Sequence, residues 1–429
     1  RGGTTAYSSS TVTLSNTVTA VNDAPVASGS ATLSAVNEDS TPSGATVSSL
    51  FSSNFSDSTD AVSGGSSANT LAGIAITSYT RDATKGEWQY SSDGTNWTTI
   101  SSSISAASSS LTFKSTDYLR FLPAANWNGS APTLTVALID SSTTVSTNAT
   151  VDVSTRGGTT AYSSSTVTLS NTVNAVNDAP VASGSATLTA IDEDTANPSG
   201  ATVSSLFSSN FSDSTDTVSG GSSANTLAGI AITSYTRDAT KGEWQYSTNG
   251  SSWTTIGSSI SAASSSLTFK STDYLRFLPA ANWNGSAPTL TVALIDSSTT
   301  VSTNATVDVS TRGGTTAYSS STVTLSNTVT AVNDAPVASG SATLSAVNED
   351  STPSGATVSS LFSSNFSDST DAVSGGSSAN TLAGIAITSY TRDATKGEWQ
   401  YSSDGTNWTT ISSSISAASS SLTFKSTDY

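Results

Sequence analysis

The stretch EWQYSSDGTNWTTI (residues 87–100) shows most clearly how this chain folds. Aromatic and β-branched residues alternate with polar ones on both sides of the pair Asp93-Gly94. Alternation with a period of two predicts strands, and Asp-Gly supplies the positive-φ pair of a type I′ turn. The segment is therefore predicted to be a β-hairpin. The pair Asn249-Gly250, further along the chain, would serve the same turn.

The same alternation recurs elsewhere and predicts strands at residues 11–18, 31–36, 45–50, 71–77, 118–121, 134–139 and 166–173. No segment has sustained helical periodicity, although Leu50, Phe51 and Phe55 are expected on one short helical turn. Heavy use of Ser and Thr could instead indicate disorder, but three Trp residues in each full repeat favour a packed core. The prediction is all-β: tandem antiparallel Greek-key β-sandwiches of cadherin or immunoglobulin type, arranged as an elongated rod.

The chain is a tandem repeat. RGGTTAYSSSTVTLSNTV starts at residues 1, 156 and 312, so the spacing is 155 and then 156 residues, and Asn197 is the inserted residue. Residues 312–429 are identical to residues 1–118. A unit of this length is domain-sized. We expect residues 1–22 to be the last strand of a preceding repeat, residues 23–177 and 178–333 to be whole domains, and residues 334–429 to be a truncated one, as in a portion of a longer protein.

Composition excludes several classes of function. The 429 residues include no Cys, His or Met, which removes the commonest general base, the thiol nucleophile and disulfides. With 31 acidic residues against 14 basic ones, the net charge of −17 argues against nucleic acid and anionic membranes as partners and leaves cations. No apolar run approaches the roughly 18 residues of a membrane span, and no leader is evident. We expect no enzyme: paired acids that recur in every repeat are unusual for a glycosidase.

The acids fall mostly in predicted turns. If strands run alternately up and down, Asp57, Asp60 and Asp140 lie where the chain enters the domain, beside the linker pair Asn22-Asp23. Glu38 and Asp39 then lie at the exit, where they would meet the next linker and the acids at the entrance of the next domain. Such a constellation suits Ca²⁺, which takes six to eight oxygen ligands. The alternative is that the acids cap loops and keep the surface soluble.

The candidate metal ligands share this placement at domain ends. They are Asn22, Asp23, Glu38, Asp39, Asp57, Asp60, Asp140, Asn177, Asp178, Glu193, Asp194, Asp213, Asp216, Asp296, Asn333, Asp334, Glu349, Asp350, Asp368 and Asp371.

Five motifs occur in a fixed order in the first full repeat: VNDAPV, VNEDS, FSDSTDAVSGGSSANTLAGIAIT, WQYSSDGTNW and YLRFLPAANWNG. Together they resemble the cadherin-like tandem repeats of giant bacterial surface proteins, often described as RTX-type adhesins. The resemblance covers every repeat. It implies calcium-associated β-sandwiches that act as extenders and hold a terminal adhesive or enzymatic module away from the cell. It supports metal-side positions at Asn22-Asp23, Glu38-Asp39 and Asp57 with Asp60. Where the family often has Trp-Asp, this chain has Ile139-Asp140, which keeps the acid and loses the aromatic ring.

The favoured hypothesis is a non-catalytic, extracellular stalk segment of a secreted bacterial surface adhesin, rigidified by Ca²⁺ at its domain junctions. Its expected partners are calcium ions and the neighbouring repeats of the same chain. The alternative is a structural subunit of a filament, sheath or surface layer in which identical chains associate laterally. A third class is a carbohydrate-binding module, in which Trp88, Trp97 and Trp127 would form a sugar platform rather than pack the sheet.

Overall fold

The computed structural model describes residues 3–61, 68–216, 224–371 and 379–429. By its contacts the chain divides into two compact units, Arg1–Asp178 with Asp213–Asn225, and Ala179–Ser212 with Thr226–Tyr429. The first unit holds the first full repeat together with residues 213–225 of the second, and the second unit holds the rest of the second repeat and the third. Within the described residues, every strand pair joins two strands of the same repeat.

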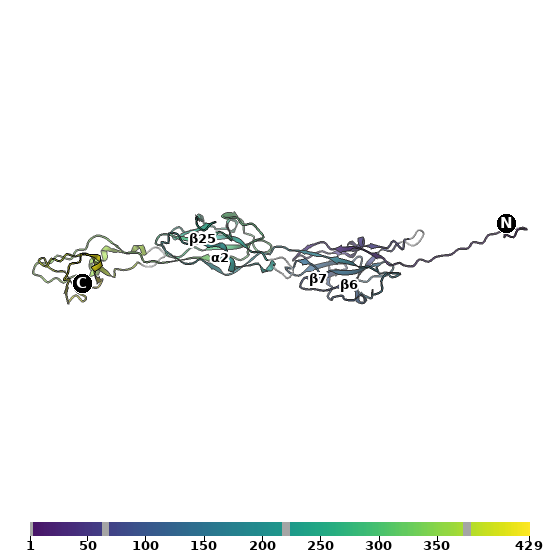
Figure 1. The fold of residues 1–429 in the computed structure, drawn as a ribbon, viewed down its shortest axis with the longest axis horizontal. Coiled ribbons are helices and arrows are strands. Elements are labelled where there is room, and N and C mark those ends of the chain that lie inside the picture. Colours follow the sequence, from purple (N-terminus) through teal and green to yellow (C-terminus); the bar gives the residue numbers. More distant parts are fainter. Residues whose placement is uncertain (1–2, 62–67, 217–223, 372–378) are drawn as a thin grey trace. The chain divides into compact units, whose positions relative to one another are not determined.

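The first full repeat has two main sheets, and Figure 1 labels one strand of each, β6 and β7. The six-stranded sheet has the order β13 (Ala149–Val151), β9 (Ser110–Lys114), β6 (Leu71–Tyr79), β12 (Leu134–Asp140), β14 (Val167–Ser170), β2 (Ser30–Thr32). The four-stranded sheet has the order β4 (Ala45–Thr46), β10 (Tyr118–Pro123), β7 (Gly86–Ser91), β8 (Thr98–Thr99). Two smaller sheets are β11 (Gly129–Ser130), β15 (Thr172–Asn174), β3 (Val36–Asn37), and β1 (Val26–Ala27) with β5 (Phe55–Ser56). The helices are α1 (Val47–Phe51), η1 (Ser52–Asn54) and η2 (Ala107–Ser109).

The second full repeat has the same order of elements. Its strands are β16 (Val181–Ala182), β17 (Ser185–Thr187), β18 (Ile191–Asp192), β19 (Ala201–Thr202), β20 (Phe211–Ser212), β21 (Leu227–Tyr235), β22 (Gly242–Ser247), β23 (Thr254–Thr255), β24 (Ser266–Lys270), β25 (Tyr274–Pro279), β26 (Gly285–Ser286), β27 (Leu290–Asp296), β28 (Ala305–Val307), β29 (Val323–Ser326) and β30 (Thr328–Thr330). Its helices are α2 (Val203–Phe207), η3 (Ser208–Asn210), η4 (Ser214–Asp216) and η5 (Ala263–Ser265).

The third repeat keeps fewer strands. They are β31 (Val337–Ala338), β32 (Phe366–Ser367), β33 (Gly384–Ile387), β34 (Gln400–Tyr401), β35 (Thr409–Thr410) and β36 (Leu422–Lys425), with α3 (Val358–Phe362), η6 (Ser363–Asn365), η7 (Ser369–Asp371) and η8 (Ala418–Ser420). Trp399, which matches the fully buried Trp88, is 56% exposed here. Residues 312–429 match residues 1–118, so this sequence includes the third repeat only as far as Tyr429, the match of Tyr118.

The two main sheets of the first full repeat pack face to face around one apolar core. Residues of both sheets belong to that core, and Tyr90 of β7 contacts Phe113 of β9 with ring centroids 5.0 Å apart. The indole of Trp88 has no exposed surface, and its Nε1 donates to the Pro132 carbonyl at 2.6 Å. A β-sandwich follows, as the alternation predicted.

The six-stranded sheet is also covered on its outer face. Ala75 of β6 and Ile139 of β12 belong to a second apolar cluster with Val145, Val153 and Ala161. These partners come from the long segment between β12 and β14, which folds back over the sheet. This second cover explains why the runs LAGIAIT and LTVALID are apolar at nearly every position, as strands buried on both faces are.

Two strand predictions need correction. The fold is mostly antiparallel, but β14 pairs with β2 and β15 with β3 in parallel, so the strands do not simply alternate up and down. The segment 45–50 is a strand only at β4, after which α1 begins. Thr46 is the N-cap of α1, and its Oγ1 accepts the Ser49 amide at 3.1 Å. The short helical turn expected near Leu50 and Phe51 is thereby confirmed.

Residues 11–18 form no strand, although the identical sequence forms β29 and β30 further on. Val12 and Leu14 are each 97% exposed, whereas the matching Val323 and Leu325 are fully buried. A strand needs a partner for its backbone groups, and this segment has none among the described residues.

The hairpin is confirmed, with Gln89 opposite Thr99 and Tyr90 opposite Thr98. Its turn is not of type I′, because Gly94 has φ +73° but Asp93 is not among the positive-φ residues. A loop of six residues connects the strands, and the Asp93 carboxylate organises it by accepting the amides of Thr95 and Asn96 at 2.8 and 2.7 Å. These hydrogen bonds hold the pKa of Asp93 far below its ordinary value.

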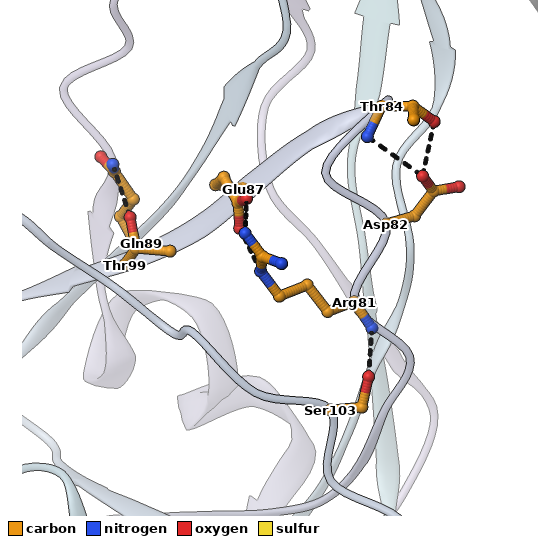
Figure 2. A network of polar contacts seen from close by, with 7 residues as sticks. All are labelled: Arg81, Asp82, Thr84, Glu87, Gln89, Thr99 and Ser103. Atoms are coloured by element: carbon orange, nitrogen blue, oxygen red, sulfur yellow. Dashed lines mark hydrogen bonds and ion pairs between the residues drawn. The ribbon is translucent and has the colours of Figure 1, made fainter.

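Polar contacts also fix the loop that precedes the hairpin. Figure 2 shows the Arg81 guanidinium directed at the Glu87 carboxylate, with Nε 2.9 Å from Oε2. The Arg81 amide donates to Ser103 Oγ at 2.9 Å, and Asp82 accepts the Thr84 amide at 3.1 Å. The Arg81 guanidinium and the Glu87 carboxylate therefore neutralise each other within this loop and the first strand of the hairpin.

Candidate cation site at the linkers

The linker pair Asn22-Asp23 enters the first full domain through a set of specific hydrogen bonds. The Asp23 amide donates to Asp60 Oδ1 at 2.9 Å. The Asn22 side-chain amide donates to Asp140 Oδ2 at 3.3 Å and to the Thr160 carbonyl at 3.2 Å. The structure therefore brings the linker together with two of the three acids that the sequence placed at the entrance.

Asp57, the third acid, is the least satisfied group of the site. Its side chain is 5% exposed, and neither carboxylate oxygen has a hydrogen-bond partner. Burial raises the pKa of Asp57 above the ordinary value of 3.8, and nearby carboxylates raise it further, in the order Asp60, Asp140 and Asp23. The backbone amide of Asn69 lies close by and lowers the pKa, although it does not complete a hydrogen bond to either oxygen. The ionised form of a buried carboxylate among other carboxylates is destabilised, and a nearby positive charge would offset that cost.

Asn69 and the loop at residues 157–160 belong to this site, and the sequence analysis did not include them. The Asn69 side-chain amide donates to Asn22 Oδ1 at 2.7 Å and to Asp60 Oδ2 at 2.9 Å. The Gly158 carbonyl accepts the Ala24 amide at 2.8 Å. The recurrence of SSANT and RGGTT in every repeat could have pointed to these residues. Neither motif contains an acidic residue, however, so a search for carboxylate ligands did not select them.

Asp140 lies at the end of β12 and is fully buried. Its Oδ1 accepts the Ser142 amide at 2.8 Å and also the Ser142 hydroxyl. Oδ2 faces Asn22. Ile139 packs in the second apolar cluster and is 1% exposed, so this position is filled without an aromatic ring.

At the exit of the same domain, Glu38 and Asp39 lie where the sequence placed them, but they differ in exposure. Glu38 is 5% exposed, and its two oxygens accept the Val176 amide at 2.6 Å and the Asn128 side-chain amide at 3.0 Å. Asp39 is exposed, with φ +58°, and its Oδ1 accepts the Asn126 amide at 2.8 Å. Glu38 therefore holds the chain just before the next linker, and the Asp39 carboxylate remains accessible at the surface.

The next linker repeats the entrance pattern, and its acids from 178 and 213–225 belong to the first unit. The Asp178 amide donates to Asp216 Oδ1 at 2.8 Å, and the Asn225 side chain bridges Asn177 and Asp216 at 2.7 and 2.9 Å. Burial raises the pKa of Asp178, and so do the carboxylates of Asp39, Asp216 and Glu38. Acids from the exit turn and from the following repeat are thus close enough to act on one another.

The third linker gives the same picture within the second unit. The Asp334 amide donates to Asp371 Oδ1 at 2.8 Å, and the Asn380 side chain reaches Asn333 and Asp371. Burial raises the pKa of Asp334, and four carboxylates raise it further: Asp194, Asp371, Glu193 and Asp368. One oxygen of Asp334 and one of Asp368 are buried without a hydrogen-bond partner.

Two predicted ligands, Glu349 and Asp350, stand apart from these groups. Both are exposed in the third repeat. Asp296 belongs to the second unit, where it is fully buried and its Oδ1 accepts the Ser298 amide at 2.8 Å. Within the part of the chain that the structure describes, no group of three or more acidic side chains is arranged so that it could hold a metal ion as it stands.

The Trp residues of the first full domain pack inside it. Trp88 is fully buried and Trp127 is 2% exposed. Trp97 is half-buried, and the Arg120 guanidinium carbon lies 4.1 Å from its ring centroid. These three rings therefore serve the core and the Arg120 contact rather than a flat, open platform.

Comparisons with known proteins give structural matches only. No family model matches the chain, and no curated protein matches it. Extracellular cadherin domains 1–4 of protocadherin gamma B7 match over 78% of this chain and 57% of theirs, with 16% identity and a TM-score of 0.35. Fibronectin(III)-like modules of Clostridium thermocellum CbhA match over 59% of this chain and 82% of theirs, with 11% identity and a TM-score of 0.12. The chain thus spans little more than half the length of the protocadherin structure. The β-sandwich fold rests on the sheets described above.

The described residues include no helix that is long and apolar enough to cross a membrane.

Proposed function

We propose that this chain is a non-catalytic extender segment of an extracellular surface protein, and that its linkers take up Ca²⁺. The observation that carries the proposal is Asp57. Its carboxylate is buried, has no hydrogen-bond partner and faces three other acids. At the other two linkers the matching Asp213 and Asp368 each accept a backbone amide at Oδ2, from Asn225 at 3.0 Å and from Asn380 at 2.9 Å. The Asp57 position favours an oxygen-loving cation because carboxylate and amide oxygens are the ligands that Ca²⁺ prefers.

The residues that would hold the ion are the linker Asn-Asp pairs and the acids around them. At the first linker these are Asn22, Asp23, Asp57, Asp60 and Asp140. At the second, Asp39 and Asp178 would join Asp213 and Asp216. Because the acids do not converge as they stand, binding requires their side chains to rotate toward the ion. The ion would supply positive charge that offsets carboxylate repulsion and thereby restricts the linker.

The test is small-angle X-ray scattering of the 429-residue chain in chelator and in about 1 mM CaCl₂, a concentration suited to extracellular calcium modules. We expect calcium to narrow the distance distribution, because each linker then samples fewer orientations. MgCl₂ at the same concentration is the control, since Mg²⁺ demands a smaller octahedral site and dehydrates reluctantly. Scattering curves and melting temperatures that are the same in chelator and calcium would contradict the calcium part of the proposal.

An extender role is favoured over a laterally associating fibre by the surface of the full repeats. Between residues 23 and 330, the exposed large apolar side chains among those described are Val26 and Val181. The edge strands are short: β2 and β13 have three residues each, and β4 and β8 have two. Short edges and scattered apolar residues do not make a lateral interface. Sedimentation velocity checks this, because a single monomer boundary from micromolar to high concentration is expected, with or without calcium.

A further inference from the structure

The carboxylate of Glu38 is buried at the exit of the domain, and its hydrogen bonds join three separate segments. Glu38 itself follows β3. Its Oε2 accepts Asn128 Nδ2 from the segment between β10 and β11, and its Oε1 accepts the amide of Val176, two residues after β15 ends. Its own amide donates to the Asn174 carbonyl at 3.0 Å. The last residues before the linker are therefore held on both sides.

The second full domain repeats this arrangement. Glu193 is 4% exposed, and its oxygens accept the Val332 amide at 2.6 Å and Asn284 Nδ2 at 2.9 Å. The Glu193 amide donates to the Thr330 carbonyl at 2.9 Å. The two full domains therefore agree in partners and nearly in distance, even though the preceding residue is Asn37 in one and Asp192 in the other.

In the third repeat the matching glutamate is Glu349. Residues 346–350 have the same sequence as 35–39, but this chain contains no residues that match Asn128 and Val176 there. Glu349 is exposed, and the strand that would match β3 is absent from the described residues around it. In both full domains the buried glutamate has the same two partners, an Asn side chain and a backbone amide just before the linker.

From these contacts we infer that Glu38 and Glu193 are positioning residues that fasten the start of each linker, and that this role needs no bound cation. Both oxygens already accept donors, and the carboxylate has the shape and charge for two N–H groups at once. The fastened amide lies two residues before Asp178, or before Asp334 in the second case, so the fastening sets where each linker acid begins. The inference rests on the proposed function and refines its cation site by separating the residue that places the linker from those that would bind the ion.

The experiment exchanges donor and acceptor between Glu38 and Asn128 in the full chain, in chelator. In Glu38→Gln alone, the side-chain oxygen can accept only one of the two donors, Asn128 Nδ2 or the Val176 amide. The new N–H₂ group then faces the other donor, which is left unsatisfied. Asn128→Asp alone brings two carboxylates together. In the double variant, the new side-chain amide at position 38 can donate to the new carboxylate at position 128, while its oxygen still accepts the Val176 amide. The readout is hydrogen exchange of the peptide that covers residues 171–177. This peptide contains Asn174, whereas the matching peptide of the second domain contains Thr330, so the two peptides differ in mass.

We expect Glu38→Gln to lower protection of the Val176 amide about 10- to 100-fold, as for loss of a hydrogen bond to a charged group. The double variant should restore protection to within a few-fold of wild type. The internal reference is a peptide that begins before residue 312 and covers Val332, because residues 327–333 alone have the same sequence as residues 16–22. Its protection should not change. Unchanged protection in Glu38→Gln, or a double variant no better than the single ones, would overturn the inference.

Calcium titration separates this role from ligation. If Glu38 only positions the linker, the double variant binds calcium as wild type does. If calcium affinity stays as low in the double variant as in Glu38→Gln while protection is restored, Glu38 is a ligand and the inference fails. If no variant, nor the wild type, binds calcium, the proposed function fails and the exchange data still decide the role of Glu38. Should Asn128→Asp prevent folding, the same exchange at Glu193 and Asn284, read at Val332, replaces it.

Discussion

Replacing Asp57 by Asn should change the stability of the chain in opposite directions in chelator and in calcium. In chelator, the wild-type carboxylate is buried beside Asp60, Asp140 and Asp23 without a hydrogen-bond partner. Asn has nearly the same shape and no charge, so the penalty of a buried unsatisfied charged group, about 1–3 kcal/mol or more, is largely removed. The variant should therefore unfold about 2–10 °C higher than wild type in chelator.

In calcium the order should reverse, because Asn has lost the charge that would meet the ion. The change is made at Asp57 alone, because the matching Asp213 accepts the Asn225 amide at 3.0 Å and is not equivalent. The assay is calorimetric or Trp-fluorescence melting of the 429-residue chain in both buffers. The control variant carries Asn at Asp152 and Asp308, exposed acids that accept a nearby serine amide, and should change little in either buffer.

The pH dependence gives the same prediction a second readout. The folded-state pKa of Asp57 is raised above its unfolded value, near 3.8, so the folded state binds a proton more readily. The penalty is present at neutral pH and disappears as pH falls through the raised pKa. The advantage of the Asn variant in chelator should therefore shrink on acidification toward about pH 4. A variant that is less stable than wild type in chelator at about pH 7 would refute the argument.

Two further predictions concern the framework around Arg120. Gly44→Ala should destabilise the domain by about 2–4 kcal/mol, because at φ +71° its Cβ would lie 2.6 Å from both the Leu119 carbonyl oxygen and the Trp97 ring; Gly158→Ala, at φ +62° in open space, should cost only about 1 kcal/mol, and urea unfolding of the two variants compares them. Trp97→Ala should cost about 1–2 kcal/mol by removing the ring stacked on the largely buried Arg120 guanidinium, whereas Trp97→Phe should retain part of it, and equal losses for both variants in a urea melt would contradict the stacking contribution.

Strands that carry their own signal were predictable from the sequence, and those defined by a distant partner were not. The hairpin strands β7 and β8 lie where alternation placed them. Residues 11–18 alternate just as clearly but form no strand. The identical sequence at β29 and β30 lies between two sets of partners, β17 and β18 on one side and β27 and β26 on the other. The parallel pairs of β14 with β2 and β15 with β3 are also set by such distant contacts. Periodicity reports which face of a strand is apolar and says nothing about the neighbouring strand.

The residues of the candidate site also fall into those that the sequence predicted and those that it did not. Counting turns sufficed to place Asp57, Asp60 and Asp140 beside the first linker, since acids at strand ends collect at the ends of a sandwich. It could not show that Asn69 would join the linker to Asp60, because an amide in a serine-rich loop resembles every other loop residue.

Nor could the sequence separate Glu38 from Asp39. Adjacent acids point to different sides of the turn: Glu38 becomes buried against Asn128 and the Val176 amide, while Asp39 adopts φ +58° and stays exposed. The same five residues at 346–350 bury neither acid. The partners that bury Glu38 lie 90 and 138 residues away along the chain, beyond the reach of any local pattern. A motif shared by every repeat can mark where a linker begins, but whether its glutamate fastens that linker depends on the rest of the domain being folded around it.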